Sequence, residues 1–405
     1  MKGSSVLKKL SPLFRLLPLL TLSFSYGGVI ENHLSEPKNR LFDYSEKINS
    51  LRSDILRKSW ISPLMLNYST SRTSNSFGRD GRNDIFTISM DQPIFESGGI
   101  YSAIKYASAL EGANSMDIEL ARRKSVIEAV RILMELRKLK LQRRQLQLLV
   151  ENDEIDIKRK KEQYIAGIID SSFLDQAILQ RNRDKTSLLG LRLQEVSLLN
   201  SFRLLSDKDP YSLKIPRLKL IEKRSFLASN MEIERERLDA LSKDYESSMT
   251  LSKYLPSLSV FGSYNDEKGD YDISMKDYSD SYYRVGLRLS MPININSLQD
   301  IEASRVEYLK SMVQLQEKRK EAENEYDTIL TTISLIESKI ALARSDEKLY
   351  SKLLKSTQEL YRAGSKTKLD IDTLKNSMQM ARLDAQVYEL EKQIQLLKLY
   401  EKVNE

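Results

Sequence analysis

The sequence predicts a mixed α/β membrane protein made of two copies of one unit, each a strand hairpin followed by a long helical hairpin. Three observations predict this class: an apolar N-terminal segment, two long tracts without proline, and two tracts in which apolar and polar residues alternate. Landmarks also recur, since Pro63 and Pro256 lie 193 residues apart and Gly167 and Gly364 lie 197 apart. Such spacing indicates an internal two-fold repeat.

Residues 1–27 have the pattern of a secretory signal peptide. Three lysines precede an apolar run from Leu10 to Phe24, and the small-ended triplet Ser25-Tyr26-Gly27 follows. We therefore expect the mature chain to start near Val29 or a few residues earlier. Because Arg15 and two prolines interrupt the apolar run, a disordered or weakly membrane-associated tail is the alternative.

Composition excludes several classes of function. The chain has no cysteine and a single histidine, His33, so thiol nucleophiles, cysteine-bound zinc and most histidine-based acid–base sites lack their residues. We expect no enzyme, no metal and no cofactor. The net charge of +7 falls to +3 without residues 1–27, because that segment holds four positive side chains and no acidic ones. A nearly balanced chain gives little support for a nucleic-acid partner.

Proline and glycine divide the rest of the chain into two matching repeats. The first repeat is predicted over residues 28–206, with a strand hairpin at about 63–95 and a helical hairpin at about 100–206. A linker at 207–225 precedes the second repeat at 226–405, with strands at about 256–293 and helices at about 297–403. Four prolines mark the passages between strands and helices: Pro63, Pro93, Pro256 and Pro292.

The strand tracts have one apolar and one polar face. Val285, Leu287 and Leu289 alternate with Arg284 and Arg288, which is typical of a half-buried strand. Two hairpins alone bury too little to be stable in water. An apolar outer face suits a transmembrane barrel closed by oligomerisation, with outer-membrane lipid around it. In such a barrel Arg284, Arg288 and Asp91 face the lumen.

Five aromatic residues near the strands predict an aromatic girdle at the membrane interface, with ordinary loop and strand tyrosines as the alternative. They are Trp60, Tyr68, Tyr264, Tyr282 and Tyr283.

The helical tracts carry apolar residues at heptad-like spacing, which indicates helix-to-helix seams. One seam comprises Leu342, Leu349, Leu353 and Leu360, and another comprises Leu374, Met378, Ala381, Ala385 and Tyr388. The spacing by itself fits either an antiparallel coiled coil or the wall of a channel.

Four kinds of segment recur in an order that is more specific than any one of them. They are Leu255-Pro256-Ser257-Leu258-Ser259 entering a strand, residues 285–293 leaving one, residues 93–99 at the first strand-to-helix passage, and the tips Tyr164-Ile165-Ala166-Gly167 and Tyr361-Arg362-Ala363-Gly364. In this order they resemble the TolC family of bacterial outer-membrane efflux and secretion channels. The resemblance covers nearly all of the mature sequence.

The resemblance implies a homotrimer in which each chain gives four strands to a β-barrel of 12 strands, continued by a long periplasmic coiled-coil barrel. It implies an outer-membrane location with the helical part in the periplasm. It also implies an exit duct of a tripartite efflux pump or type I secretion system. The partners would be a periplasmic adaptor (membrane fusion) protein and an inner-membrane pump of the RND or ABC type.

Two departures from the family pattern stand out. Pro292-Ile293 is followed by Asn294-Ile295-Asn296-Ser297 instead of a glycine-rich turn. The helix before the first strand, predicted at roughly Leu41 to Lys58, is short for the family.

The second tip resembles the periplasmic gate of the family, which implies gate roles for Tyr361, Lys366 and Asp370, with Asp372 as a further candidate. The alternative is that Gly364 ends one helix and Asp370 caps the next.

At the first tip, Asp170 and Asp175 are the acidic candidates to pair with Lys366. Gly167 and Gly364, with those two acids, mark the hairpin tips where an adaptor would make contact.

Other classes stay open at the sequence level. A periplasmic adaptor also carries a long helical hairpin, yet it needs neither two copies nor strands with an apolar face. A structural coiled-coil protein of the cell envelope needs no paired strand hairpins. The sequence does not identify the transported substrate.

Overall fold

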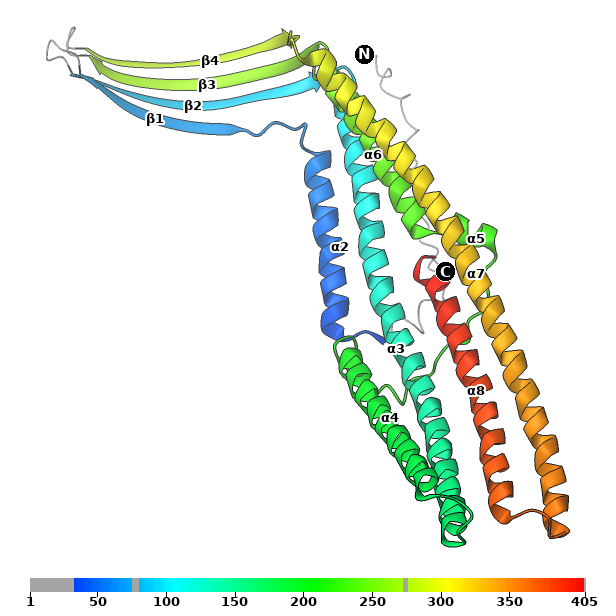
Figure 1. Ribbon diagram of the computed structural model, residues 1–405. Coiled ribbons are helices and arrows are strands. Elements are labelled where there is room, and N and C mark those ends of the chain that lie inside the picture. The colour runs from blue at the N-terminus through cyan, green and yellow to red at the C-terminus, as the bar shows by residue number, and fades with distance from the viewer. Residues whose placement is uncertain (1–32, 75–79, 272–275, 404–405) are drawn as a thin grey trace, which may run out of the picture.

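The computed structural model describes residues 33–74, 80–271 and 276–403, so the predicted signal peptide at 1–27 lies outside the described residues. The chain folds into an antiparallel sheet that extends sideways from one end of a long layer of helices (Figure 1). The elements in chain order are α2 Glu36–Arg57, β1 Met65–Ser74, β2 Asp80–Phe95, α3 Gly99–Ile165, α4 Ser171–Arg203, α5 Lys223–Ala228, α6 Met231–Ser252, β3 Ser257–Tyr271, β4 Lys276–Ser290, α7 Ser297–Arg362 and α8 Lys368–Glu401.

The four strands form one sheet in the order β1-β2-β3-β4, so the two strand hairpins pair through β2 and β3. Strands β2, β3 and β4 have 16, 15 and 15 residues, longer than the ~10 residues that cross a bilayer core. β1 and β4 lie at the two edges and each pairs on one side only.

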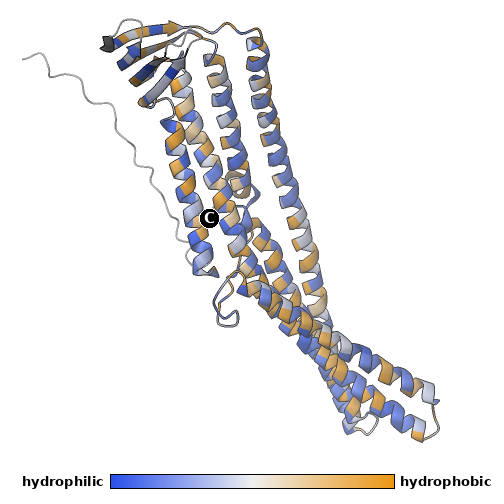
Figure 2. Ribbon diagram, turned by 90° about the vertical axis from the view of Figure 1, so that its left-hand side faces the viewer, coloured by the Kyte–Doolittle hydropathy of each residue, from blue (hydrophilic) through white to orange (hydrophobic). Residues whose placement is uncertain are grey.

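The helices form a layer with a fixed neighbour order. Near the sheet, α3 packs between α2 and α6, and α6 packs on α7; farther away the order is α4, α3, α8, α7. Apolar and polar residues alternate around every long helix (Figure 2), as expected where each helix meets neighbours on two sides and solvent or a lumen on the others.

Helix α2 starts at Glu36, with Pro37 in its first turn, five residues before the predicted start at Leu41. The prediction was wrong at this end because it followed the apolar residues and overlooked that proline favours the first helical turn. At 22 residues α2 equals α6, its counterpart in the second repeat.

The core lies at mid-height of the helical layer, where both repeats meet. Phe226 and Val403 are fully buried there, and the Phe226 ring lies 5.5 Å from the Tyr326 ring between centroids. A neighbouring cluster joins Val130 and Met134 of α3 to Leu397 of α8. Burial of this size anchors α3, α7 and α8 to one another at this level.

Residues 204–222, which we call the strap, run across these helices between α4 and α5. Leu218 is bound at both backbone groups by Gln393: its N–H donates to Oε1 at 2.7 Å, and its carbonyl accepts from Nε2 at 3.4 Å. Arg137 donates to the Leu213 carbonyl at 3.1 Å and the Tyr326 hydroxyl donates to the Ile221 carbonyl at 2.8 Å. The strap is therefore fastened to α3, α8 and α7 in turn.

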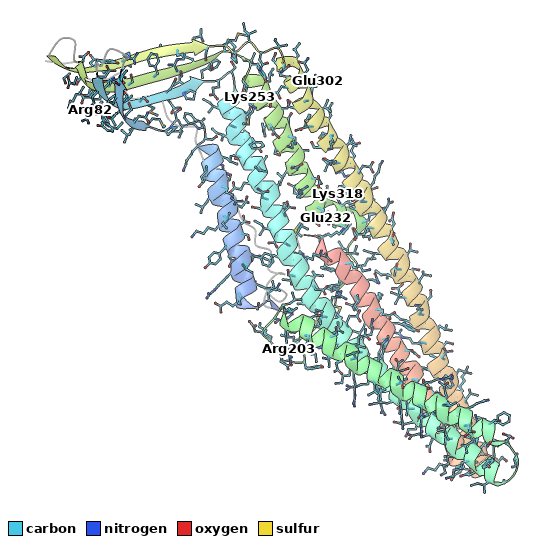
Figure 3. The ribbon with its side chains drawn as sticks, turned by 60° about the vertical axis from the view of Figure 1, so that its left-hand side comes forward. Arg82, Arg203, Glu232, Lys253, Glu302 and Lys318 are labelled. Carbon is cyan, nitrogen blue, oxygen red and sulfur yellow. The ribbon has the colours of Figure 1, made fainter. Side chains whose placement is uncertain are left out.

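The C-terminal end of the described chain binds to α6 and α7 at the height of the core. The Met231 N–H donates to the Lys402 carbonyl at 2.8 Å, and Lys402 Nζ lies 3.1 Å from Glu232 and 2.6 Å from Glu325. Figure 3 places Glu232 where α6 begins, level with the end of α8. Strap, core and C-terminal end together brace the middle of the molecule.

Candidate functional site: the hairpin tips and the polar sheet face

The two helical-hairpin tips have the same backbone turn. Gly167 and Gly364 have φ values of 67° and 78°, which L side chains rarely adopt. The residue after each glycine donates its backbone N–H to a carbonyl in the last turn of the preceding helix. Ile168 donates to the Gln163 carbonyl and Ser365 donates to the Leu360 carbonyl, both at 2.9 Å. This is the Schellman arrangement, and it satisfies carbonyls that a helix end leaves free.

Asp370 lies just inside the second tip, and both of its carboxylate oxygens have partners within the chain. Oδ2 accepts from the Thr367 N–H at 3.0 Å and the Thr367 hydroxyl at 2.9 Å, while Oδ1 accepts from Arg159 Nη2 at 2.9 Å. Hydrogen bonding to the Thr367 backbone, aided by Arg159 and Lys366, lowers the pKa of Asp370. Asp370 therefore completes the capping box with the N-cap residue Thr367 at the start of α8, and it also ties α8 to α3.

The other sequence-predicted tip residues lie apart from that link. Tyr361 is 45% exposed and Lys366 is exposed. Asp372 lies half-buried in the groove between α3 and α8.

At the first tip, Asp170 caps α4 by accepting from the Ser172 N–H at 2.8 Å, and Asp175 is exposed. Within the described part of the chain Lys366 pairs with neither of these acids. The predicted pairing of Lys366 with an acid of the first tip is therefore not formed among the described residues, where Lys366 acts electrostatically on Asp370 instead.

Sequence reasoning missed a ladder of three polar contacts between α3 and α8. Gln145 donates to Asp384 at 2.8 Å, Asn376 donates to Asn152 at 3.0 Å, and Arg159 pairs with Asp370 at 2.9 Å. The α3 members lie seven residues apart, so they share one side of the helix. This polar heptad repeat was the available signal, and the search for apolar heptads passed over it.

The strand register separates the two faces of the sheet. Leu287, Val260 and Gln92 share a row on one face, while Arg284, Ser263, Ser89 and Met65 share a row on the other. On the apolar face Val285, Leu287 and Leu289 are 74%, 69% and 74% exposed. A large exposed apolar surface of this kind marks a membrane or partner contact.

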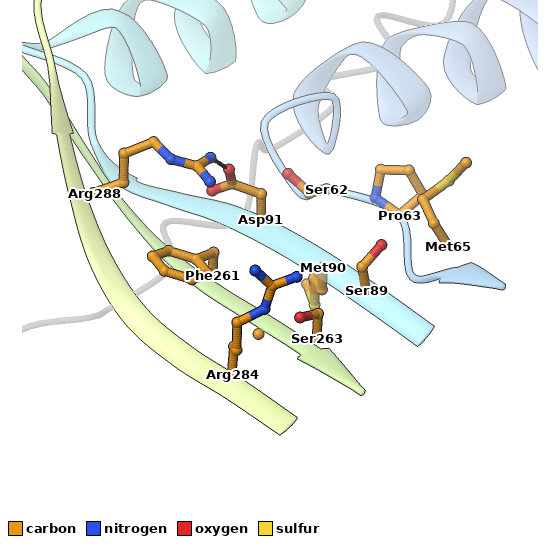
Figure 4. Close-up of a pocket in the computed structure, with 11 residues that line it drawn as sticks. Ser62, Pro63, Met65, Ser89, Met90, Asp91, Phe261, Ser263, Arg284 and Arg288 are labelled. Atoms are coloured by element: carbon orange, nitrogen blue, oxygen red, sulfur yellow. Dashed lines mark hydrogen bonds and ion pairs between the residues drawn. The ribbon is translucent and has the colours of Figure 1, made fainter. Parts of the chain in front are cut away.

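On the polar face, Arg288 and Asp91 form an ion pair (Figure 4). The Arg288 guanidinium also lies 4.9 Å from the Phe261 ring centroid, a cation–π contact. Gly286 sits under that ring, because a Cβ there would come within 2.6 Å of Phe261 Cζ. Arg284, Arg288 and Asp91 thus share one concave face, the one the sequence assigned to a lumen.

One aromatic residue was assigned to the wrong face. Tyr282 lies on the polar face, where its hydroxyl donates to Glu267 at 3.2 Å and its ring lies 5.5 Å from the Arg284 guanidinium. The girdle prediction is therefore wrong for Tyr282, because adjacent residues of a strand point to opposite faces. Tyr283 and Tyr264 lie opposite each other on the apolar face.

The helical seams also divide into two kinds. Ala381 and Ala385 are buried inside the chain, whereas Leu342 and Leu349 on α7 are 64% and 53% exposed. The spacing predicted both seams, but only one finds its partner within a single chain.

Among the helices of the described residues, none contains an apolar stretch of the length needed to span a bilayer.

These features define a channel-type outer-membrane protein with a strand domain and a long helical domain. The fold of the whole chain is similar to VceC of Vibrio cholerae, with a TM-score of 0.72, 15% identity, and 94% of this chain covering 96% of that one. It is also similar to the CmeC outer-membrane channel of Campylobacter jejuni, with a TM-score of 0.74, 16% identity, and coverage of 92% and 84%. None of the curated proteins matches the chain by sequence.

Residues 224–405 match the family described as outer membrane efflux protein. The predicted resemblance to the TolC family is therefore confirmed: the second half carries the family's domain and the whole chain has its fold. The protein is an outer-membrane channel protein rather than an enzyme, with its helical part in the periplasm.

A pair of acidic residues on α3 and α4 generates a pH prediction. Burial, followed by a hydrogen bond with Asp184, raises the pKa of Asp153 from its ordinary 3.8 to about 6. Asp184 also accepts from Gln180 at 2.9 Å. Between pH ~4 and ~6 the folded chain holds a proton that the unfolded chain has lost, so stability falls as pH rises across this window.

We expect Asp153→Asn to stabilise the protein above about pH 6 and to change little below about pH 4. The partly exposed position limits the gain to about 1 kcal/mol. Melting followed by circular dichroism at pH 4 and 7.5 measures it. Glu317→Gln, which removes the 3.3 Å ion pair with Lys320 on α7, is the control and should not stabilise. An equal gain from Asp153→Asn at both pH values would contradict this account.

Proposed function

We propose that this protein is the outer-membrane exit duct of a tripartite efflux pump or a type I secretion system. The duct is a homotrimer that passes small molecules or proteins from an inner-membrane pump, of the RND or ABC type, through a periplasmic adaptor to the exterior. The observation that supports this most directly is that a single chain leaves both of its edges uncovered, in the sheet and in the helical layer.

The sheet edges require more copies of the chain. An open strand edge in lipid leaves N–H and C=O groups without partners, at several kcal/mol each. Pairing β4 of one chain with β1 of the next satisfies both edges, and three copies of the four-stranded sheet give a barrel of 12 strands. The apolar face then meets lipid, and Arg284, Arg288 and Asp91 line the lumen.

The helical edges carry matching apolar stripes. On α2 the stripe has spacings of three and four residues and is 49–69% exposed; it comprises Leu41, Tyr44, Ile48, Leu51 and Ile55. On α7, the opposite edge of the layer, Val306, Leu309 and Val313 are 51%, 52% and 57% exposed. Because one edge differs from the other, the contact is head-to-tail, and such contacts form a ring when the rotation between neighbouring chains closes, as a closed barrel requires.

The lower helices supply the same kind of contact. α4 exposes Leu189 and Leu193 at 62% and 74%, and the α7 seam of Leu342 and Leu349 lies on the opposite edge. Packing α4 of one chain on α7 of the next would surround a tunnel with 12 helical segments. An ordinary coiled-coil protein has no use for this pair of edges together with the apolar sheet face.

The tips are the proposed gate and the proposed contact for the adaptor. Parting of α3 from α8 at the tip would separate the first hairpin from the second and widen the entrance. Three polar contacts hold this seam, each worth about 0.5–1.5 kcal/mol net, or somewhat more where charged. In this proposal Tyr361 and Lys366, which are exposed, act between chains, Asp372 acts at the α3–α8 groove, and Gly167, Asp170, Asp175 and Gly364 shape the surface an adaptor would meet.

The assembly is tested by placing one charge on either face of the same strand. We expect Leu66→Arg to prevent recovery of a trimer from the outer membrane, because an arginine on the lipid face costs roughly 2–4 kcal/mol per chain at the midplane. Asn67→Arg, one residue away on the polar face, should assemble. Mass measurement in detergent gives the copy number. Equal assembly of the two variants would refute the assigned lipid face, and a folded wild-type monomer would refute the trimer.

The proposed gate motion is tested by removing polar contacts between α3 and α8. We expect Arg159→Ala combined with Asn152→Ala to raise single-channel conductance in a planar bilayer. The double variant loses the two α3–α8 contacts nearest the tips, Arg159 with Asp370 and Asn152 with Asn376. Arg362→Ala removes an equal charge at the tip from an exposed side chain and serves as the control. Unchanged conductance in the double variant, with the trimer intact, would reject α3–α8 parting as the gate motion.

A further inference from the structure

The middle of the strap is basic on its outward side, whereas its two ends carry the exposed acids Asp207, Asp209 and Glu222. Residues 210–221 contain three basic side chains, Lys214, Arg217 and Lys219, and no acidic one. Their apolar neighbours Leu213, Ile215 and Leu218 pack into the core clusters beneath. From Leu213 to Lys219 the strap therefore presents its apolar side chains inward and its cations outward, while Tyr211 and Leu220 on either side of this stretch are exposed.

These three cations lack ion-pair partners in the described part of the chain, and all three are exposed. Other basic residues nearby are neutralised: Arg143 lies 3.0 Å from Glu195, and Lys223 lies 2.9 Å from Asp327. An unpaired charge contributes its full field to the surface, so the strap attracts anions.

The backbone that carries these cations is held in place. The bonds from Arg137, Gln393 and Tyr326 fix the strap carbonyls at Leu213, Leu218 and Ile221, and the Tyr400 hydroxyl donates to the Lys219 carbonyl at 3.1 Å. Their Cα positions are therefore fixed, while all three side chains are exposed. A partner would therefore meet a preformed row of cations rather than a loop that must first be ordered.

The position of the strap excludes lipid headgroups as the partner. Helix α6 has 22 residues between the level of the strap and the sheet, which is about 33 Å at 1.5 Å per residue. That is several times the Debye length of about 8 Å at physiological salt. The partner must be an anion of the periplasm itself.

We propose that the outward face of the strap, Lys214, Arg217 and Lys219, binds the cell-wall peptidoglycan through the carboxylates of its stem peptides. This rests on the proposed function, because a strap on the inner face would lie across the tunnel, whereas on the outer face three straps encircle the duct. Protein interfaces depend on apolar or aromatic anchors in pockets. Between Lys214 and Lys219 the outward side chains are all cations, which suits a flexible polymer with repeated carboxylates.

Co-sedimentation with isolated peptidoglycan sacculi tests the proposal. The purified protein in detergent is mixed with sacculi at about 50 mM and 500 mM salt, and the bound fraction is measured. We expect binding at low salt that is lost at high salt, since surface charges are screened. Sacculi whose carboxyl groups have been converted to amides should bind at least tenfold less protein.

The matched variants locate the contact. Lys214→Glu, Arg217→Glu and Lys219→Glu together should reduce binding at least tenfold. Lys348→Glu, Lys352→Glu and Lys355→Glu make the same change of charge on exposed positions of α7, farther toward the tips, and should reduce it less than twofold. Detergent mass measurement confirms that both variants keep the wild-type copy number.

Two results would overturn the proposal: equal binding of the strap variant and the α7 variant, or undiminished binding to amidated sacculi. The second result would show that the sacculi are bound through groups other than the stem-peptide carboxylates. A monomeric wild-type protein would refute the proposed trimer separately, since each chain carries its own three cations and its binding to sacculi can still be read.

Discussion

The two unpaired edges of the sheet are the constraint on which the rest of the structure depends. β1 and β4 each pair on one side only, and the face formed by Val285, Leu287 and Leu289 is apolar and exposed. Water can hydrogen-bond the free strand edges but exposes the apolar face at a cost in free energy. Lipid covers the apolar face but leaves the edge N–H and C=O groups without partners. In the proposed trimer, pairing with further copies satisfies both, and the same assembly would cover the exposed apolar stripes of α2, α4 and α7.

The contacts between α3 and α8 differ along their length, being apolar at mid-height and polar near the tips. At mid-height the seam is apolar, with Val130 and Met134 packed on Leu397, and the strap crosses it. Toward the tips the same two helices meet through Gln145, Asn152 and Arg159. Buried apolar side chains contribute roughly 1.5–3 kcal/mol each, whereas a polar rung exchanges with water at little net cost. The molecule is thus braced in the middle and weakly joined at the end proposed to open.

The sequence was sufficient for the elements whose signals are local. Proline positions and residue alternation located the strands near Pro63, Pro93 and Pro256, and the Tyr-x-Ala-Gly segments located both tips. The girdle prediction was wrong for Tyr282 because it counted aromatic residues without applying the two-residue period of a strand. The start of α2 failed because Pro37 was not taken as a first-turn residue.

Contacts between distant segments were beyond sequence reasoning. Arg159 and Asp370 are 211 residues apart, and neither has a local pattern that identifies the other. Likewise the spacing of Leu342 and Leu349 predicted a seam but not that both side chains are exposed in a single chain. The linker at 207–225 was predicted without any notice of its basic residues, and its attachment to α3, α7 and α8 came only from the structure.

Hydrogen exchange at the sheet edges measures the central claim most directly. The wild-type protein is extracted from membranes in detergent, and exchange of the backbone amides of β1 and β4 is compared with that of β2 and β3. If further copies pair with both edges, the edge strands exchange as slowly as the inner ones. Edge amides that exchange within seconds, beside protected β2 and β3, would show that the edges stay open and would contradict the account.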